Sequence, residues 1–129
     1  MAADPVIAII DDDASVRAAM GGLIRSLGFD CRLFASAEEF LATARPEDMD
    51  CLVMDVQMPG MSGLELQRHL QARHVTVPVV IITAYPEPQI REQALRAGAI
   101  GFLAKPFPAE AMIDCLEQAL RRQDPDPSA

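Results

Sequence analysis

Four aspartates follow two apolar stretches of the sequence, where their carboxylates could gather. Asp11, Asp12 and Asp13 come directly after VIAII, and Asp55 comes directly after CLVM. Carboxylates held close together raise one another's pKa unless a cation lies among them. Oxygen ligands in an open, hydrated cluster suit Mg²⁺, which keeps several waters and binds one or two carboxylates plus phosphate. Asp11, Asp12 and Asp55 are therefore candidate metal ligands, whereas Asp13 is better explained as a helix cap.

A hydroxyl and an ammonium group end two further apolar stretches. Thr83 closes VVIIT, and Lys105 follows GFLA and precedes a proline. A hydroxyl donor and a lone ammonium group beside a metal–carboxylate cluster would form a receptor for a phosphoryl group. Threonine and lysine are common residue types, so neither alone indicates a site. Thr83 and Lys105 become candidates because they stand at the ends of apolar runs, as the aspartates do.

Five short apolar runs predict the strands that must position these side chains. They are Val6–Ile10, Phe29–Phe34, Cys51–Val56, Val77–Thr83 and Ile100–Ala104. Continuously apolar runs are typical of parallel strands covered on both faces. The second run carries Asp30 and Arg32 on one face, which indicates an edge strand.

Helical patterns separate the runs. Five helices are predicted. Apolar spacings of three and four mark four of them, by Val16, Met20, Leu23 and Leu27, by Leu66 and Leu70, by Ile90, Ala94 and Ala97, and by Met112, Leu116 and Ala119, and the second contains Phe40 and Leu41. Ser36 and Glu39 predict a capping box for the second helix. Pro86 and Pro88 disfavour helical backbone in the residues before them, so we expect the fourth helix to begin near Gln89. Pro108 suits the first turn of the fifth.

Strand and helix thus alternate five times, which predicts an α/β fold with a doubly wound parallel sheet of five strands. The common strand order for this arrangement is 2-1-3-4-5, and ligands bind outside the carboxyl ends of strands 1 and 3. That edge is where the candidate aspartates, Thr83 and Lys105 end their strands.

Composition limits the function classes. The 129 residues suit one domain, which we expect over residues 1–123, with residues 124–129 as a disordered tail or the stub of a linker. A net charge of −8 argues against direct nucleic acid binding. The three cysteines have no zinc-binding spacing, and no segment reads as a signal peptide or a membrane span. We therefore expect a cytoplasmic protein with no membrane contact.

Four sequence blocks carry a resemblance to a known family. AIIDDDASVR, VMDVQMPGMSGLEL, IITA and GFLAKPF resemble the response-regulator receiver domains of two-component signalling, over the chain from Val6 to about Arg122. IDDDASVR, ASAEEFL and MPGMSGLEL are most similar to receivers of nitrogen-fixation-type transcriptional regulators. The resemblance implies a flavodoxin- and chemotaxis-receiver-like fold. It also implies a phosphorelay signalling domain that catalyses only its own phosphotransfer and dephosphorylation, and is not an enzyme.

The resemblance also implies roles for single residues. Asp55 would be the phosphoacceptor. Asp12, Asp55 and the backbone carbonyl of Gln57 would ligate Mg²⁺, and Asp11 would hold it through water. Lys105 and Thr83 would contact the phosphoryl group, with the backbone N–H of Ala84 as a companion donor. Phe102 would be an aromatic switch residue, and Lys105–Pro106 would be a cis peptide. A plain core aromatic explains Phe102 almost as well.

The resemblance implies partners as well. A sensor histidine kinase or a histidine phosphotransfer protein would donate the phosphoryl group. The surface of the fourth helix, the strand Ile100–Ala104 and the fifth helix would then change, to control an output such as transcription, and could form a homodimer.

Two alternatives compete with this interpretation. Asp11-x-Asp13 after an apolar strand is also similar to the start of haloacid-dehalogenase-type phosphatases, where Asp11 would be the nucleophile and Asp13 the acid–base. Asp55 would then have no role. The second alternative is a binding module of the same fold that works without phosphorylation.

Overall fold

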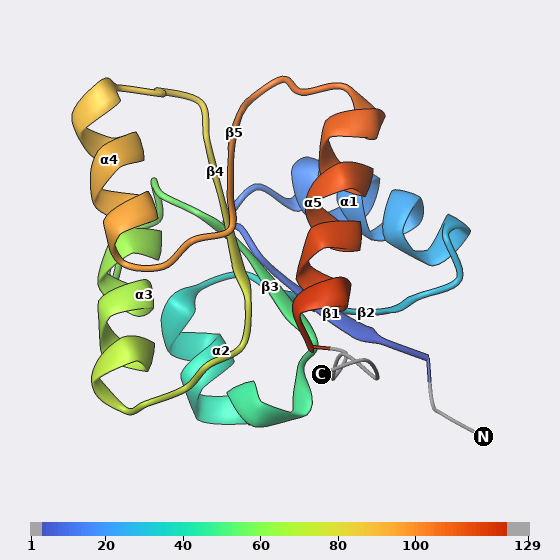
Figure 1. Cartoon of the computed structure of the whole chain (residues 1–129), viewed down its shortest axis with the longest axis horizontal. Helices are drawn as coiled ribbons and strands as arrows, with labels where there is room; N and C mark the ends of the chain where they lie inside the picture. The colour runs from blue at the N-terminus through green and yellow to red at the C-terminus, as the bar shows by residue number, and fades with distance from the viewer. Residues whose placement is uncertain (1–3, 124–129) are drawn as a thin grey trace.

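A single parallel sheet of five strands forms the centre of the computed structural model, which describes residues 4–123 (Figure 1). Its strands are β1 (Val6–Ile10), β2 (Asp30–Phe34), β3 (Cys51–Asp55), β4 (Val79–Thr83) and β5 (Gly101–Ala104), in the order β2-β1-β3-β4-β5. The helices are α1 (Ala14–Ser26), α2 (Ala37–Thr43), α3 (Gly63–Ala72), α4 (Pro88–Arg96) and α5 (Ala109–Gln123), with a short 3-10 helix at Pro46–Asp48. The predicted fold class and strand order are confirmed.

The sheet separates two apolar cores. On one face α1 and α5 pack against alternate strand residues, and Met112, Leu116 and Ala119 are fully buried as predicted. On the other face α2, α3 and α4 pack against the remaining strand residues (Figure 1). The strands β1, β3 and β4 are covered on both faces, because nearly all their residues are buried. The strand β2 lies at the edge, as its charged residues predicted.

Strand ends differ slightly from the predicted ones. The strand β4 begins at Val79 and not at Val77, because Pro78 has no N–H to donate to the ladder. Three other predicted runs, Phe29–Phe34, Cys51–Val56 and Ile100–Ala104, each lose one terminal residue. None of these shifts moves a candidate site residue off the carboxyl edge of the sheet.

The capping boxes at the starts of α2 and α3 differ from the prediction. The capping box predicted at Ser36 is half formed: Ser36 Oγ accepts from Glu39 N at 3.0 Å, but the Glu39 carboxylate accepts from Ala35 N. The complete capping box joins Ser62 and Glu65 at the start of α3, which the sequence analysis missed. It fixes the helix that follows the loop after Asp55.

The helix α4 starts late, close to the predicted Gln89. It begins at Pro88, in the first helical turn, where the missing N–H costs nothing. Ala94 is the one residue of α4 that is buried. The Nε2 of Gln67 on α3 donates to the backbone oxygen of Ala94 at 3.0 Å, and the Oε1 of Gln67 has no partner among the described residues. Few contacts therefore fasten α4 to the sheet.

The predicted tail, residues 124–129, lies outside the described residues. Within residues 4–123 no helix combines the length and the apolar character that crossing a bilayer requires.

Replacing Phe40 with alanine should cost about 3–5 kcal/mol of the free energy of unfolding, since the fully buried ring would leave a cavity. The Phe40 ring packs edge-on against Phe34, with ring centroids 5.1 Å apart. Urea unfolding measures the loss. Leu95→Ala on the exposed part of α4 is the control and should change the free energy by less than about 0.5 kcal/mol. Equal losses in both variants would contradict the described core.

Candidate functional site

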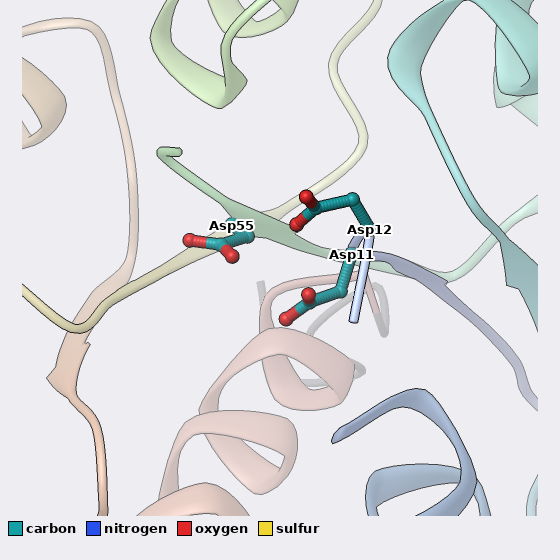
Figure 2. Close-up of side chains that lie close together, drawn as sticks. All are labelled: Asp11, Asp12 and Asp55. Atoms are coloured by element: carbon teal, nitrogen blue, oxygen red, sulfur yellow. The ribbon is translucent and has the colours of Figure 1, made fainter. Parts of the chain in front are cut away.

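Three carboxylates meet at the carboxyl edge of the sheet. Ile10 and Met54 are paired in neighbouring strands, so Asp11 and Asp55 follow side by side at the ends of β1 and β3. One carboxylate oxygen from each of Asp11, Asp12 and Asp55 lies within 4.8 Å of the others (Figure 2). Asp11 and Asp55 are buried, whereas Asp12 is exposed. The structure thus brings together all three candidate metal ligands.

Lys105 bridges the two buried acids. Its Nζ lies 2.8 Å from Asp11 Oδ2 and 3.0 Å from Asp55 Oδ2. The cis peptide between Lys105 and Pro106 is present as predicted. The backbone N–H of Lys105 donates to the oxygen of Thr83 at 2.8 Å, which extends the pairing of β4 and β5. The ammonium group therefore reaches across the sheet edge to the acids of β1 and β3.

Burial and charge work against one another in this cluster. Burial, helped by the charge of Asp11, raises the pKa of the Asp55 carboxyl above its ordinary value, although the hydrogen bond from Lys105 acts to lower it. Burial acts to lower the pKa of Lys105, but the hydrogen bonds and charges of Asp11 and Asp55 outweigh burial and raise it. Lys105 therefore stays charged near neutral pH, and Asp55 is destabilised as an anion.

Asp11 and Asp13 have structural hydrogen bonds. Asp11 Oδ1 accepts from Asp13 N at 2.9 Å, and its Oδ2 binds Lys105. Asp13 Oδ1 accepts from Ser15 N at 2.9 Å and from Val16 N at 3.3 Å, as the cap of α1. The proposed acid–base of the phosphatase alternative, Asp13, is thus occupied as a helix cap. This geometry does not favour the phosphatase alternative.

Thr83 contacts the side chain of Gln57, a contact that the sequence analysis did not predict. Its buried hydroxyl donates to Gln57 Oε1 at 2.8 Å and accepts from Tyr85 N at 3.0 Å. The backbone N–H of Gln57 lies 3.2 Å from Asp55 Oδ1. Sequence reasoning used only the backbone carbonyl of Gln57, and no motif signalled that its side chain would reach Thr83.

Ala84 and Phe102 lie near the cluster but outside it. Ala84 is exposed directly after β4, and with Lys105 it borders an apolar hollow of about 570 Å³ between α1 and the start of α5. Phe102 is half-buried and packs against the core on the α2, α3 and α4 face. Its position next to Ile81 in the sheet places it behind the edge that carries Thr83.

The loop after Asp55 is held by close backbone packing. Gly63 N donates to the oxygen of Val56 at 3.2 Å, and a Cβ on Gly63 would overlap the backbone oxygen of Asp55. Only glycine fits there without moving the phosphoacceptor candidate. The glycines in MPGMSG were the available signal, but the sequence analysis used this segment only for the family resemblance.

A second anchor of this loop comes from α2. Glu38 Oε2 accepts from Met61 N at 2.8 Å, and this hydrogen bond lowers the pKa of Glu38. Gly60, just before Met61, has a φ of 77°, which favours glycine. The loop between Asp55 and α3 is therefore held by hydrogen bonds at Met61 and at Gly63.

The donor set fits a hard divalent cation. Asp11, Asp12 and Asp55 supply oxygen atoms only, one carboxylate is exposed to solvent, and the acids outnumber the one lysine that they share. Mg²⁺ prefers such oxygen ligands and retains waters in an open site. The cluster can thus hold a cation and offer an anionic oxygen of Asp55 beside it.

A parallel sheet with an acidic pocket and a half-buried lysine at its switch point defines a class of domains built to handle phosphoryl groups. Residues 7–117 match the family described as the response regulator receiver domain. The chain therefore belongs to the receiver domain family of two-component response regulators. Domains of this family are signalling domains rather than classical enzymes, pair in general with histidine kinases, and generally bind Mg²⁺ at an acidic pocket.

Curated relatives support the assignment. The chain is 35% identical to the transcriptional regulatory protein FixJ of Bradyrhizobium diazoefficiens over 119 residues, which cover 92% of this chain and 58% of FixJ. It is 37% identical to the response regulator protein TodT of Pseudomonas putida over 116 residues, which cover 90% of this chain and 51% of TodT. The chain spans about half the length of the curated relatives it matches. The predicted similarity to receivers of nitrogen-fixation-type regulators is confirmed.

Solved structures agree with the sequence relatives. The response regulator StyR is 46% identical with a TM-score of 0.85, and the match covers 94% of this chain and 64% of StyR. The crystal structure of FixJ-N is 32% identical with a TM-score of 0.84, and the match covers 97% of this chain and all of that one. These neighbours share the fold described above.

Replacing Gly63 with alanine should cost about 1–3 kcal/mol of the free energy of unfolding, because the new methyl group must displace the Asp55 backbone. Chemical denaturation measures the change. Gly22→Ala in α1 is the matched control: nothing lies within 4 Å of the added carbon, so helix propensity should raise stability by about 0.5–1 kcal/mol. Opposite signs for the two variants are expected, and the same sign would count against the close approach.

Proposed function

We propose that Asp55 accepts a phosphoryl group from a phosphohistidine of a sensor histidine kinase or a histidine phosphotransfer protein. One observation carries the proposal: the Asp55 carboxylate lies 3.0 Å from the ammonium group of Lys105, with oxygens of Asp11 and Asp12 within 4.8 Å. Lys105 would balance the charge of an incoming phosphoryl group on one side, and a cation held by the carboxylates would balance it on the other. The exposed side of Asp12 leaves the pocket open to solvent.

The transfer exchanges one bond for another. An oxygen of Asp55 attacks the phosphorus in line, the O–P bond forms, and the N–P bond to the donor histidine breaks with its electron pair returning to the ring nitrogen. The product is an acyl phosphate, which water later hydrolyses at the same place. Positioning and charge stabilisation account for most catalysis of such transfers. Lys105 supplies the charge, and its hydrogen bond to Asp11 keeps the ammonium group at the pocket.

The proposed metal ligands are Asp12, Asp55 and the backbone carbonyl of Gln57, with Asp11 acting through water. Bound Mg²⁺ would neutralise charge on the phosphoryl oxygens and on the crowded carboxylates. The fit rests on the all-oxygen cluster within 4.8 Å and on the raised pKa of Asp55, whose anion a second cation would stabilise.

The proposed response starts at Thr83. Its hydroxyl and the N–H of Ala84 would bind the phosphoryl group, and the movement of Thr83 would give Phe102 room to turn inward. The face of α4, β5 and α5 would then change, since α4 buries only Ala94. This face is the proposed surface for homodimerisation and for control of an output such as transcription.

A protein donor needs a surface beside Asp55. The apolar hollow of about 570 Å³ is lined by Val16, Met20 and Leu23 of α1 and reaches Lys105 and Phe107. We place the docking of the phosphohistidine donor there. The domain would span residues 1–123, act in the cytoplasm and make no direct contact with nucleic acid or membrane.

Replacing Asp55 with asparagine should abolish covalent phosphorylation, because the amide lacks the nucleophilic oxygen. The wild-type protein, incubated with acetyl phosphate and Mg²⁺, should gain one phosphoryl group that hydroxylamine releases, as measured by intact mass spectrometry. Asp30→Asn on β2 is the control and should be labelled like the wild type. Undiminished labelling of Asp55→Asn, or a labelled peptide containing Asp11 instead, would refute the assignment.

Replacing Asp12 with asparagine should weaken Mg²⁺ binding by at least about tenfold, since even the loss of an outer-shell partner has that effect. Calorimetric titration with Mg²⁺ alone measures the dissociation constant. Asp30→Asn again serves as the control, because Asp30 is an exposed acid far from the cluster in the sheet. An unchanged constant in Asp12→Asn would remove Asp12 from the ligand set.

A further inference from the structure

The hydroxyl of Thr83 is engaged by two neighbouring groups in the structure. Thr83 Oγ1 donates to Gln57 Oε1 at 2.8 Å and accepts from the backbone N–H of Tyr85 at 3.0 Å. A hydroxyl carries one proton, so it donates one hydrogen bond of this kind at a time. Thr83 can therefore donate to Gln57 or to a phosphoryl oxygen, but not fully to both.

We propose that the side chain of Gln57 is a positioning residue that holds Thr83 in its resting arrangement and competes with the phosphoryl group for the Thr83 proton. Gln57 thereby sets how strongly the domain favours the resting state. The inference rests on the proposed function, because it concerns the response to a phosphoryl group on Asp55.

Of the two hydrogen-bond partners of the Thr83 hydroxyl, only Gln57 competes with a phosphoryl group for its proton. The hydrogen bond from Tyr85 N uses a lone pair of the Thr83 oxygen and does not compete for its proton. Gln57 is also tied to the phosphoacceptor, since its backbone N–H lies 3.2 Å from Asp55 Oδ1. One residue thus contacts both Asp55 and Thr83 from the loop between them.

Burial sets the size of the effect. Thr83 is fully buried, so its hydroxyl needs an acceptor at all times. Gln57 is exposed, so water can replace Thr83 at its amide when the hydroxyl leaves. The exchange therefore involves about one net neutral hydrogen bond, which corresponds to roughly two- to tenfold in an equilibrium constant.

The main experiment measures binding of beryllofluoride, an analogue of the phosphoryl group, in the presence of Mg²⁺. Gln57→Met keeps the length of the side chain and removes the acceptor, so binding should tighten about two- to tenfold. Gln71→Met, on the exposed side of α3, is the matched control and should bind like the wild type. Tyr85, the one tyrosine of a chain without tryptophan, gives a fluorescence signal two residues from Thr83.

A double-mutant cycle separates this role from general packing. In a Thr83→Val background the hydroxyl is absent, so adding Gln57→Met should leave the affinity for beryllofluoride unchanged. An equal tightening with and without the Thr83 hydroxyl would overturn the proposal. A matching change in affinity for Mg²⁺ alone would also overturn it, because the effect would then belong to metal binding.

The resting protein provides a readout without metal or phosphoryl analogue. NMR couplings of the Thr83 side chain should show one dominant rotamer in the wild type and in Gln71→Met, and a redistribution in Gln57→Met. An unaltered rotamer in Gln57→Met overturns the inference alone. Failure of the wild type to bind beryllofluoride or to be labelled at Asp55 overturns the proposed function as well, so the two failures are distinguishable.

Discussion

Repulsion between two buried carboxylates, balanced by one lysine, is the interaction on which the site depends. Asp11 and Asp55 are nearly inaccessible to water, and both bind the same ammonium group of Lys105. Burial and the Asp11 charge keep the pKa of Asp55 raised in spite of Lys105. Such a cluster is incompletely neutralised, and either a further cation or the conversion of Asp55 to a phosphorylated form would redistribute its charge. The rest of the fold serves to hold this unfavourable arrangement in place.

The parallel sheet makes the arrangement possible. Its strand order sets β1 beside β3, so Asp11 and Asp55 must end at the same edge, and β4 and β5 bring Thr83 and Lys105 to that edge as well. Tight backbone packing then fixes the connecting loop, since Gly63 lies against the backbone oxygen of Asp55. Apolar cores on both faces of the sheet supply the stability that offsets the buried charges.

The sequence predicted those parts of the fold that follow from local patterns. Apolar runs located every strand, although the run of the edge strand β2 also carries charges, and the topology rule for such sheets predicted that Asp11, Asp12 and Asp55 lie together. The hydrogen bond between Thr83 and Gln57 was not predictable in the same way. It joins a strand end to a loop residue 26 positions earlier, through a rotamer that no periodicity encodes. The capping box at Ser62 was missed because the glycine-rich turn before it masked the pattern.

The segment from Gln57 to α3 links the site to the surface that is proposed to respond. Gln57 bonds the end of β4 through Thr83, and Gln67 on α3 bonds α4 through the backbone of Ala94. Both bonds come from glutamine amides, but only the exposed Gln57 can exchange its partner for water at small net cost, because Gln67 is buried. The Gln67 bond therefore joins α3 to α4 away from water, and Gln67 Oε1 has no partner among the described residues. If the proposed response displaces Thr83, it would act on a helix that buries only Ala94 and keeps one buried side-chain hydrogen bond to α3 among the described residues.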